Sequence, residues 1–170
     1  ENFDGHDYLE SAVAAGAAGL LVHRIPSRLN ESNFSVPVIV VNDTLKALQD
    51  LAHHWRKKMK ARFIGITGSN GKTTTKSFCQ TILSQQYSTV ASQGSFNNHW
   101  GVPLTLLSVS PETEMAVIEM GMNHTGELAE LCKIVEPDVA VVTMVGRSHI
   151  EFFGTEEKIA EAKAEIYQGS

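Results

Sequence analysis

The chain has 170 residues, of which 42% are hydrophobic and 19% are charged, and its formal net charge is −5. This composition is typical of a globular protein that buries a core, and the acidic balance argues against duplex nucleic acid as the main partner. No apolar run reaches the length of a membrane span, so we expect no membrane insertion.

The first part of the chain predicts a small α/β unit. A helical pattern covers residues 7–15, and apolar runs at 17–22 and 36–41 indicate two buried strands. A polar loop separates the two runs. We interpret residues 1–42 as part of a smaller α/β domain.

A helix is expected next, over residues 43–60, with Asp43 as its cap. Its basic end, Arg56 to Lys60, suits the negative pole of a helix. A nucleic-acid patch is the alternative explanation of these charges. We interpret residues 43–61 as a connecting helix.

Strands and helices alternate in the remaining chain, residues 62–170. The pattern predicts strands over 62–67, 88–92, 115–120 and 139–145, and helices over 71–86, 101–108, 126–135 and 155–168. Such alternation indicates βαβ units and a doubly wound parallel sheet, with ligands bound beyond the carboxyl ends of the strands. The two cysteines, Cys79 and Cys132, lack metal-ligand spacing, and we expect reduced thiols in a cytoplasmic protein.

A glycine-rich turn, ITGSNGKTTTK, joins the first of these strands to a helix. Gly68 and Gly71 permit a tight turn whose amides face an anion, Lys72 can neutralise outer phosphates, and Thr73 can reach a bound Mg²⁺. The usual pattern has an earlier glycine where this chain has Ile66, so the loop is short. A dinucleotide turn is disfavoured, because G-x-G-x-x-G is absent, and a helix start without a ligand is the other alternative. The predicted nucleotide-binding residues are Gly68, Ser69, Asn70, Gly71, Lys72, Thr73 and Thr74.

Acidic and histidine side chains follow two of the strands. Glu119 ends the run MAVIEM, where it can hold Mg²⁺, cap a loop or pair with a lysine. His149 follows the next strand and is either a metal ligand or a hydrogen-bonding residue, with Glu151 as a competing ligand. Lys163 cannot bind a metal as an ammonium, and its pattern does not distinguish it from Lys158.

Two adjacent asparagines lie in SFNNHWGVP, just before a predicted helix. Asn97 and Asn98 offer amide groups that suit a polar substrate or a nucleotide. In the alternative, they satisfy their own turn.

In combination these motifs resemble a known family, the bacterial Mur ligases, and within it the MurF type. The matching stretches are DGHDYLESAVAAGAAGLLV, ITGSNGKTTTK, GSFNNHWGVPLTLL, IEMGMNHTGELAEL and SHIEFFGTEEKIAEAKAEI. The short GxxGKTT loop is the form that this family uses. The resemblance implies an ATP-dependent ligase, which activates a carboxylate of UDP-N-acetylmuramoyl tripeptide as an acyl phosphate for attack by D-alanyl-D-alanine.

The resemblance also implies roles for individual residues. Lys72 stabilises the transferring phosphoryl group, and Thr73 and Glu119 hold one Mg²⁺. His149 corresponds to a ligand of a second Mg²⁺. Lys163 corresponds to a carbamylated lysine, which makes it carboxylate-like.

Two departures from the family pattern accompany the resemblance. Met144 stands where members usually carry asparagine, which removes a polar contact. The chain also lacks counterparts of the first part of the N-terminal domain, the later central strands and the C-terminal domain. We therefore expect a fragment of a monomeric ligase. The alternatives are a non-catalytic nucleotide-binding fragment and a folylpolyglutamate synthetase-like ligase.

Overall fold

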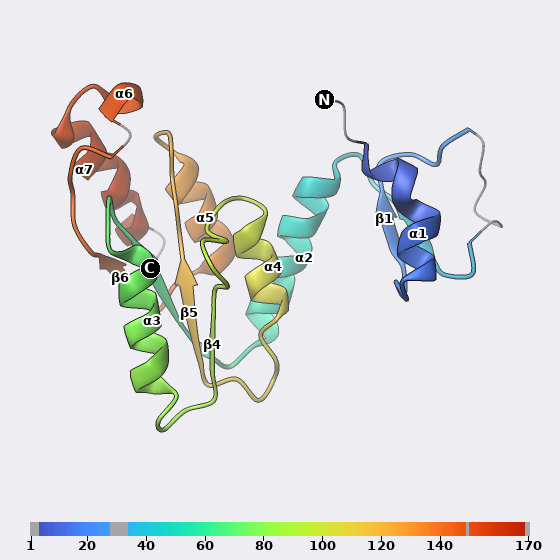
Figure 1. The fold of residues 1–170 in the computed structure, drawn as a ribbon, viewed down its shortest axis with the longest axis horizontal. Coiled ribbons are helices and arrows are strands. Elements are labelled where there is room, and N and C mark those ends of the chain that lie inside the picture. Colours follow the sequence, from blue (N-terminus) through green and yellow to red (C-terminus); the bar gives the residue numbers. More distant parts are fainter. Residues whose placement is uncertain (1–3, 28–33, 149, 169–170) are drawn as a thin grey trace. The chain divides into compact units, whose positions relative to one another are not determined.

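The computed structural model describes residues 4–27, 34–148 and 150–168 (Figure 1). The chain divides into two compact units, Glu1–Leu48 and Gln49–Ser170, with the boundary inside one helix, α2 (Thr44–Lys58). In the described part of the chain, no helix has both the length and the apolar character that a membrane crossing requires.

The first unit is a small parallel pair of strands with one short helix. Its elements are η1 (Gly5–Tyr8), α1 (Leu9–Ala14), β1 (Leu20–Val22) and β2 (Val38–Val40). Leu9, Leu20 and Val22 form its core. Both strands are shorter than predicted, because only three residue pairs align, from Leu20 with Val38 to Val22 with Val40.

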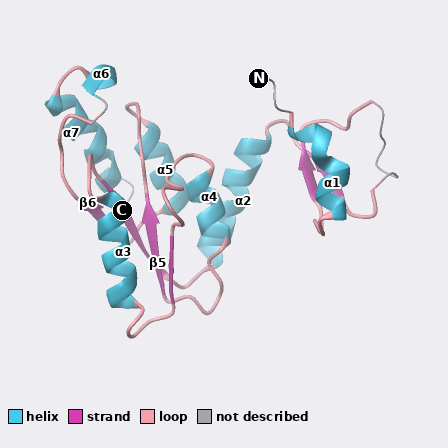
Figure 2. Ribbon diagram, in the orientation of Figure 1, coloured by secondary structure: helices cyan, strands magenta, loops and turns pink. Residues whose placement is uncertain are grey.

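The second unit is built on a parallel sheet with the strand order β4-β5-β3-β6. Figure 2 shows the alternation of strands and helices that produces it. The elements are β3 (Arg62–Thr67), α3 (Lys72–Leu83), β4 (Thr89–Ala91), α4 (Gly101–Leu107), β5 (Met115–Glu119), α5 (Glu127–Val135), β6 (Val139–Val142), α6 (Ile150–Phe153), α7 (Glu156–Ala164) and η3 (Glu165–Gln168). The predicted parallel α/β fold is confirmed.

The order of the strands creates a switch point in the middle of the sheet. From β3 the chain crosses to β4 on one side, whereas from β5 it crosses to β6 on the other. Right-handed crossovers therefore put α3 on one face and α4 and α5 on the opposite face, as Figure 1 shows. The loops that follow β3 and β5 diverge at this point, which is where ligands bind in such sheets.

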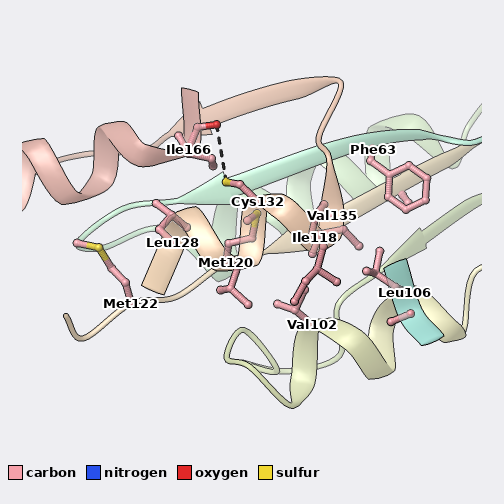
Figure 3. Close-up of a cluster of buried hydrophobic side chains, with 14 of the residues drawn as sticks. Phe63, Val102, Leu106, Ile118, Met120, Met122, Leu128, Cys132, Val135 and Ile166 are labelled. Carbon is pink, nitrogen blue, oxygen red and sulfur yellow. Dashed lines mark hydrogen bonds between the residues drawn. The ribbon is translucent and has the colours of Figure 1, made fainter. Parts of the chain in front are cut away.

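The core of the second unit lies between the sheet and α4, α5 and η3. Phe63, Ile118 and Met120 meet Leu106 and Leu128 in a buried cluster (Figure 3). Figure 3 also shows the Cys132 thiol, which donates to the carbonyl of Ile166 over 3.8 Å. Burial raises the pKa of this thiol to about 11, so Cys132 stays protonated. Both cysteines are free thiols.

The C-terminal part differs most from the sequence prediction. β6 ends at Val142 instead of residue 145, and α6 was not predicted. η3 then replaces the last turn of the helix expected over 155–168. In η3, the buried Glu165 carboxylate accepts hydrogen bonds from the amides of Gly126 (2.7 Å) and Ala129 (3.1 Å) and so caps the start of α5.

Arg56 fastens α2 to the other end of α5. Its Nε donates to the carbonyl of Val135 and its Nη2 to that of Glu136, each over 2.7 Å. The guanidinium carbon lies 3.9 Å from the centroid of the Phe63 ring. From the sequence, we related Arg56 to the helix dipole of α2. In the structure its guanidinium also pairs with carbonyls at the end of α5, which have no partner within that helix.

We expect Arg56→Ala to lower the free energy of unfolding of the second unit by about 2 to 4 kcal/mol, because two charged hydrogen bonds and a cation–π contact are lost. Both tryptophans, Trp55 and Trp100, lie in this unit, so tryptophan fluorescence during urea denaturation reports its unfolding. The control is Lys58→Ala, which removes an exposed side chain of the same helix and should change stability by less than about 0.5 kcal/mol. Equal effects of the two substitutions would contradict the bridging role.

Candidate functional site

The predicted phosphate loop joins the end of β3 to the start of α3. Gly68 has a φ of +150°, and a Cβ at this position would lie 1.9 Å from Oγ1 of Thr143. Gly71 has a φ of +80° and precedes α3 directly. Both positions therefore require glycine, for space at the first and for backbone conformation at both.

The N-terminus of α3 is open to a ligand. No side chain caps it, because the N-cap residue is Gly71. The first amides of a helix have no carbonyl within the helix to pair with. Together with the positive pole of the 12-residue helix, these donors fit an anion such as a nucleotide phosphate.

The loop is held in shape by the segment that follows β6. Thr143 Oγ1 donates to the carbonyl of Asn70 (2.6 Å), and the Ser69 amide donates to the carbonyl of Met144 (2.9 Å). Ser148 Oγ donates to the carbonyl of Ser69 (3.1 Å). Met144 supports the loop through its backbone, while its side chain is 45% exposed. The sequence analysis missed Thr143 and Ser148; the adjacent positions of β3 and β6 in a parallel sheet are the signal that could have found them.

Glu119 and Thr73 meet at the switch point of the sheet. Glu119 ends β5 opposite Ile66 of β3 and is only 1% exposed. Its Oε2 accepts a hydrogen bond from Thr73 Oγ1 over 2.9 Å, and its Oε1 accepts one from Asn97 Nδ2 over 2.8 Å. Three of the residues predicted for the site are thus in direct contact.

The oxygens of this cluster suit Mg²⁺. A hydroxyl and a carboxylate are hard ligands, and Mg²⁺ commonly takes only one or two protein ligands beside phosphates and water. Within the described ranges, no group of three His, Cys, Asp or Glu side chains is placed to hold a metal alone. The donor set therefore fits a metal that arrives with phosphate oxygens. Of the two other predicted ligands, His149 lies outside the described residues, and Lys163 lies on α7.

Lys76 is a site residue that the sequence analysis did not identify. It is 4% exposed, and its Nζ lies 3.6 Å from Oε2 of Glu119 and 2.5 Å from the carbonyl of Gly94. The pairing of Glu119 with a lysine, one of the three possibilities left open, is thus present. In the sequence, Lys76 could have been found because it lies one helical turn after Lys72 and Thr73, on the same face of the predicted helix.

The two asparagines have different surroundings. Asn97 contacts Glu119, as described above. Asn98 Oδ1 accepts hydrogen bonds from the amides of Trp100 (3.1 Å) and Gly101 (2.9 Å), in the turn that leads into α4. Asn98 therefore satisfies the backbone of its own turn, as the second of the two interpretations of these asparagines expected.

The lysines Lys72 and Lys163 lie within electrostatic reach of each other. Lys72 Nζ donates to the carbonyl of Gly68 over 2.8 Å. Lys163 on α7 is 3% exposed, and burial, followed by the charge of Lys72, lowers its pKa from 10.5 to about 8. Lys163 is thus distinguished from Lys158 of the same helix, which is exposed.

A pocket of about 470 Å³ opens beside the loop. Lys72, Asn97 and Asn98 line it together with Gly121, Asn123 and Glu127. The pocket thus brings polar side chains of the predicted site together beside the phosphate loop.

Comparisons with known proteins identify related sequences and structures. Residues 66–170 match the family described as the Mur ligase middle domain. UDP-N-acetylmuramoyl-tripeptide--D-alanyl-D-alanine ligase from Bacillus subtilis (strain 168) is 47% identical over 169 residues, which are 99% of this chain and 36% of that protein. The ligase of the same name from Escherichia coli (strain K12) is 41% identical over 169 residues, with the same two shares.

Solved structures are similar over nearly the whole chain. MurF from Acinetobacter baumannii has a TM-score of 0.88 and 38% identity, over 99% of this chain and 36% of that one. MurF ligase from Thermotoga maritima, in complex with ADP, has a TM-score of 0.85 and 36% identity, over 99% of this chain and 38% of that one. The chain thus spans about a third of the length of these relatives. The chain belongs to the Mur ligase family.

Proposed function

We propose that this chain is the nucleotide- and magnesium-binding part of an ATP-dependent amide-bond ligase, which joins D-alanyl-D-alanine to UDP-N-acetylmuramoyl tripeptide in peptidoglycan synthesis. The observation that carries the proposal is the contact between the Thr73 hydroxyl and the buried Glu119 carboxylate, beside an uncapped helix N-terminus. The names of the curated relatives support the two substrates, and the ADP of the Thermotoga maritima structure supports the nucleotide.

The loop residues Gly68 to Thr74 bind the nucleotide phosphates. The amides at the start of α3 would donate hydrogen bonds to the phosphate oxygens, and Lys72, which donates to the carbonyl of Gly68 in this structure, would neutralise the outer phosphate. Thr73 and Glu119 hold Mg²⁺, and Asn97 keeps the Glu119 carboxylate oriented. When bound, ATP supplies the phosphoryl group that activates a substrate carboxylate for attack by an amine.

Lys163 and His149 serve a second metal position. A buried ammonium close to another cation is costly, so the pKa of Lys163 is lowered to about 8 and the neutral amine forms at a lower pH than for an exposed lysine. The neutral amine attacks CO₂ and releases a proton, which yields a carbamate. This anion removes the repulsion from Lys72 and provides oxygen ligands. His149 is assigned by the family resemblance.

The remaining assignments concern the whole protein. Residues 1–42 belong to a UDP-substrate domain, 43–61 form a connecting helix, and 62–170 begin the ATP-binding domain. Asn98 contributes to substrate binding through the pocket that it lines. The ligase acts as a cytoplasmic monomer without nucleic-acid partners.

A second candidate function is nucleotide binding without catalysis. The chain spans 36% of the B. subtilis relative, and the alternative proposal is that these residues bind a nucleotide without carrying out ligation themselves. Ligation would require the longer protein. The names of the relatives disfavour a folylpolyglutamate synthetase-like activity.

Lys72→Ala should weaken binding of ATP with Mg²⁺ to this chain and slow ligation by the full-length protein roughly 100-fold, because one preorganised charge at the phosphoryl group is lost. Calorimetric titration measures the affinity, and phosphate release with both substrates measures turnover. Lys58→Ala, which removes an exposed lysine of α2, should leave both unchanged. Unaltered affinity and turnover in Lys72→Ala would refute the phosphate-loop assignment.

Carbamylation of Lys163 should depend on pH. Its pKa is lowered to about 8, so the neutral amine is scarce below this pH and increases above it. At constant dissolved CO₂, the carbamate signal in NMR spectra with isotopically labelled bicarbonate should therefore increase as the pH rises through 8. The signal should disappear in Lys163→Ala and persist in Lys158→Ala. A signal that survives Lys163→Ala would count against the assignment.

A further inference from the structure

Lys76 is a buried cation whose place in the site needs a reason beyond packing. Lysine is rarely buried, and an apolar side chain of similar volume commonly replaces a buried ion pair without loss of stability. Lys76 nevertheless lies with its Nζ 3.6 Å from the carboxylate of Glu119, which is 1% exposed. Its charge is therefore placed at the same oxygen that faces Thr73.

The contacts of Lys76 fix its position independently of any ligand. Nζ is 2.5 Å from the carbonyl of Gly94, and this hydrogen bond holds the ammonium beside Glu119. Asn97, three residues further along the chain, donates to the other carboxylate oxygen. The Glu119 carboxylate is thus oriented from both sides, by a side chain of α3 and by one of the loop that follows β4.

This arrangement balances the charge of Glu119 before a metal binds. A free divalent cation entering beside Oε2 meets the Lys76 ammonium at the same oxygen and Lys72 one helical turn away. In a buried, poorly screened site this repulsion is strong. Nucleotide phosphates add several negative charges, which outweigh the two lysines. A divalent cation that arrives with phosphates is therefore attracted to the site.

We propose that Lys76 is a positioning residue that makes metal binding at Glu119 conditional on a bound nucleotide. The inference rests on the proposed function, in which Glu119 is a metal ligand. Lys76 acts through Glu119 by orienting the carboxylate and by reducing its attraction for a cation that arrives alone.

The test compares Mn²⁺ binding to the complete chain with and without a non-hydrolysable ATP analogue, by electron paramagnetic resonance. Without nucleotide, Lys76→Met should bind Mn²⁺ at least about tenfold more tightly than the unaltered chain, because the competing charge is gone. Lys76→Arg keeps the charge and should bind Mn²⁺ as weakly as the unaltered chain. With nucleotide, the difference between Lys76→Met and the unaltered chain should shrink.

Controls separate this inference from the proposed function. Lys58→Met removes an exposed charge and should not change Mn²⁺ affinity. Glu119→Gln should weaken Mn²⁺ binding in the presence of the nucleotide analogue; if it does not, Glu119 is no ligand and the proposed function fails at this point. If Glu119→Gln weakens binding but Lys76→Met leaves nucleotide-free affinity unchanged, only the role of Lys76 is overturned. Lys76→Gln, a smaller and polar replacement, gives the same comparison if the methionine variant does not fold.

Discussion

The buried carboxylate of Glu119 is the constraint on which the arrangement of the second unit depends. It ends the central strand β5, and its two oxygens collect donors from α3 and from the loop after β4. A carboxyl group with so little exposure is tolerated only when it is paired and hydrogen-bonded. The elements that supply those partners must therefore meet at one point, and that point is the switch in the strand order.

The same constraint explains the roles of less conspicuous parts of the molecule. The carbonyl of Gly94 accepts from the lysine that pairs with Glu119, so the loop after β4 is linked to α3. Glu165 holds the start of α5, and Arg56 holds the opposite end of this helix. These anchors keep α5 along the pocket wall, which four of its residues line: Glu127, Glu130, Leu131 and Ile134.

Much of this fold is predictable from sequence because its signals are local. Continuous apolar runs gave the positions of β3 and β5, and the glycine turn marked the start of α3. What was missed depends on contacts between distant residues. Beyond the end of β6 the Thr143 amide still bonds to the carbonyl of Thr67, but the Thr143 hydroxyl and the Met144 carbonyl bond to the phosphate loop. Only its helical spacing from Lys72 and Thr73 could have singled out Lys76 in the sequence, and its pairing with Glu119 is visible only in the structure.

The phosphate loop depends on residues more than 70 positions further along the chain, since Asn70 and Ser69 are bonded to Thr143 and Ser148. This dependence has a consequence for synthesis on the ribosome. The loop emerges early but cannot be fixed until β6 and the residues after it have left the exit tunnel. A nascent chain that ends before Ser148 carries every letter of the GSNGKTT motif and still lacks hydrogen bonds that shape it.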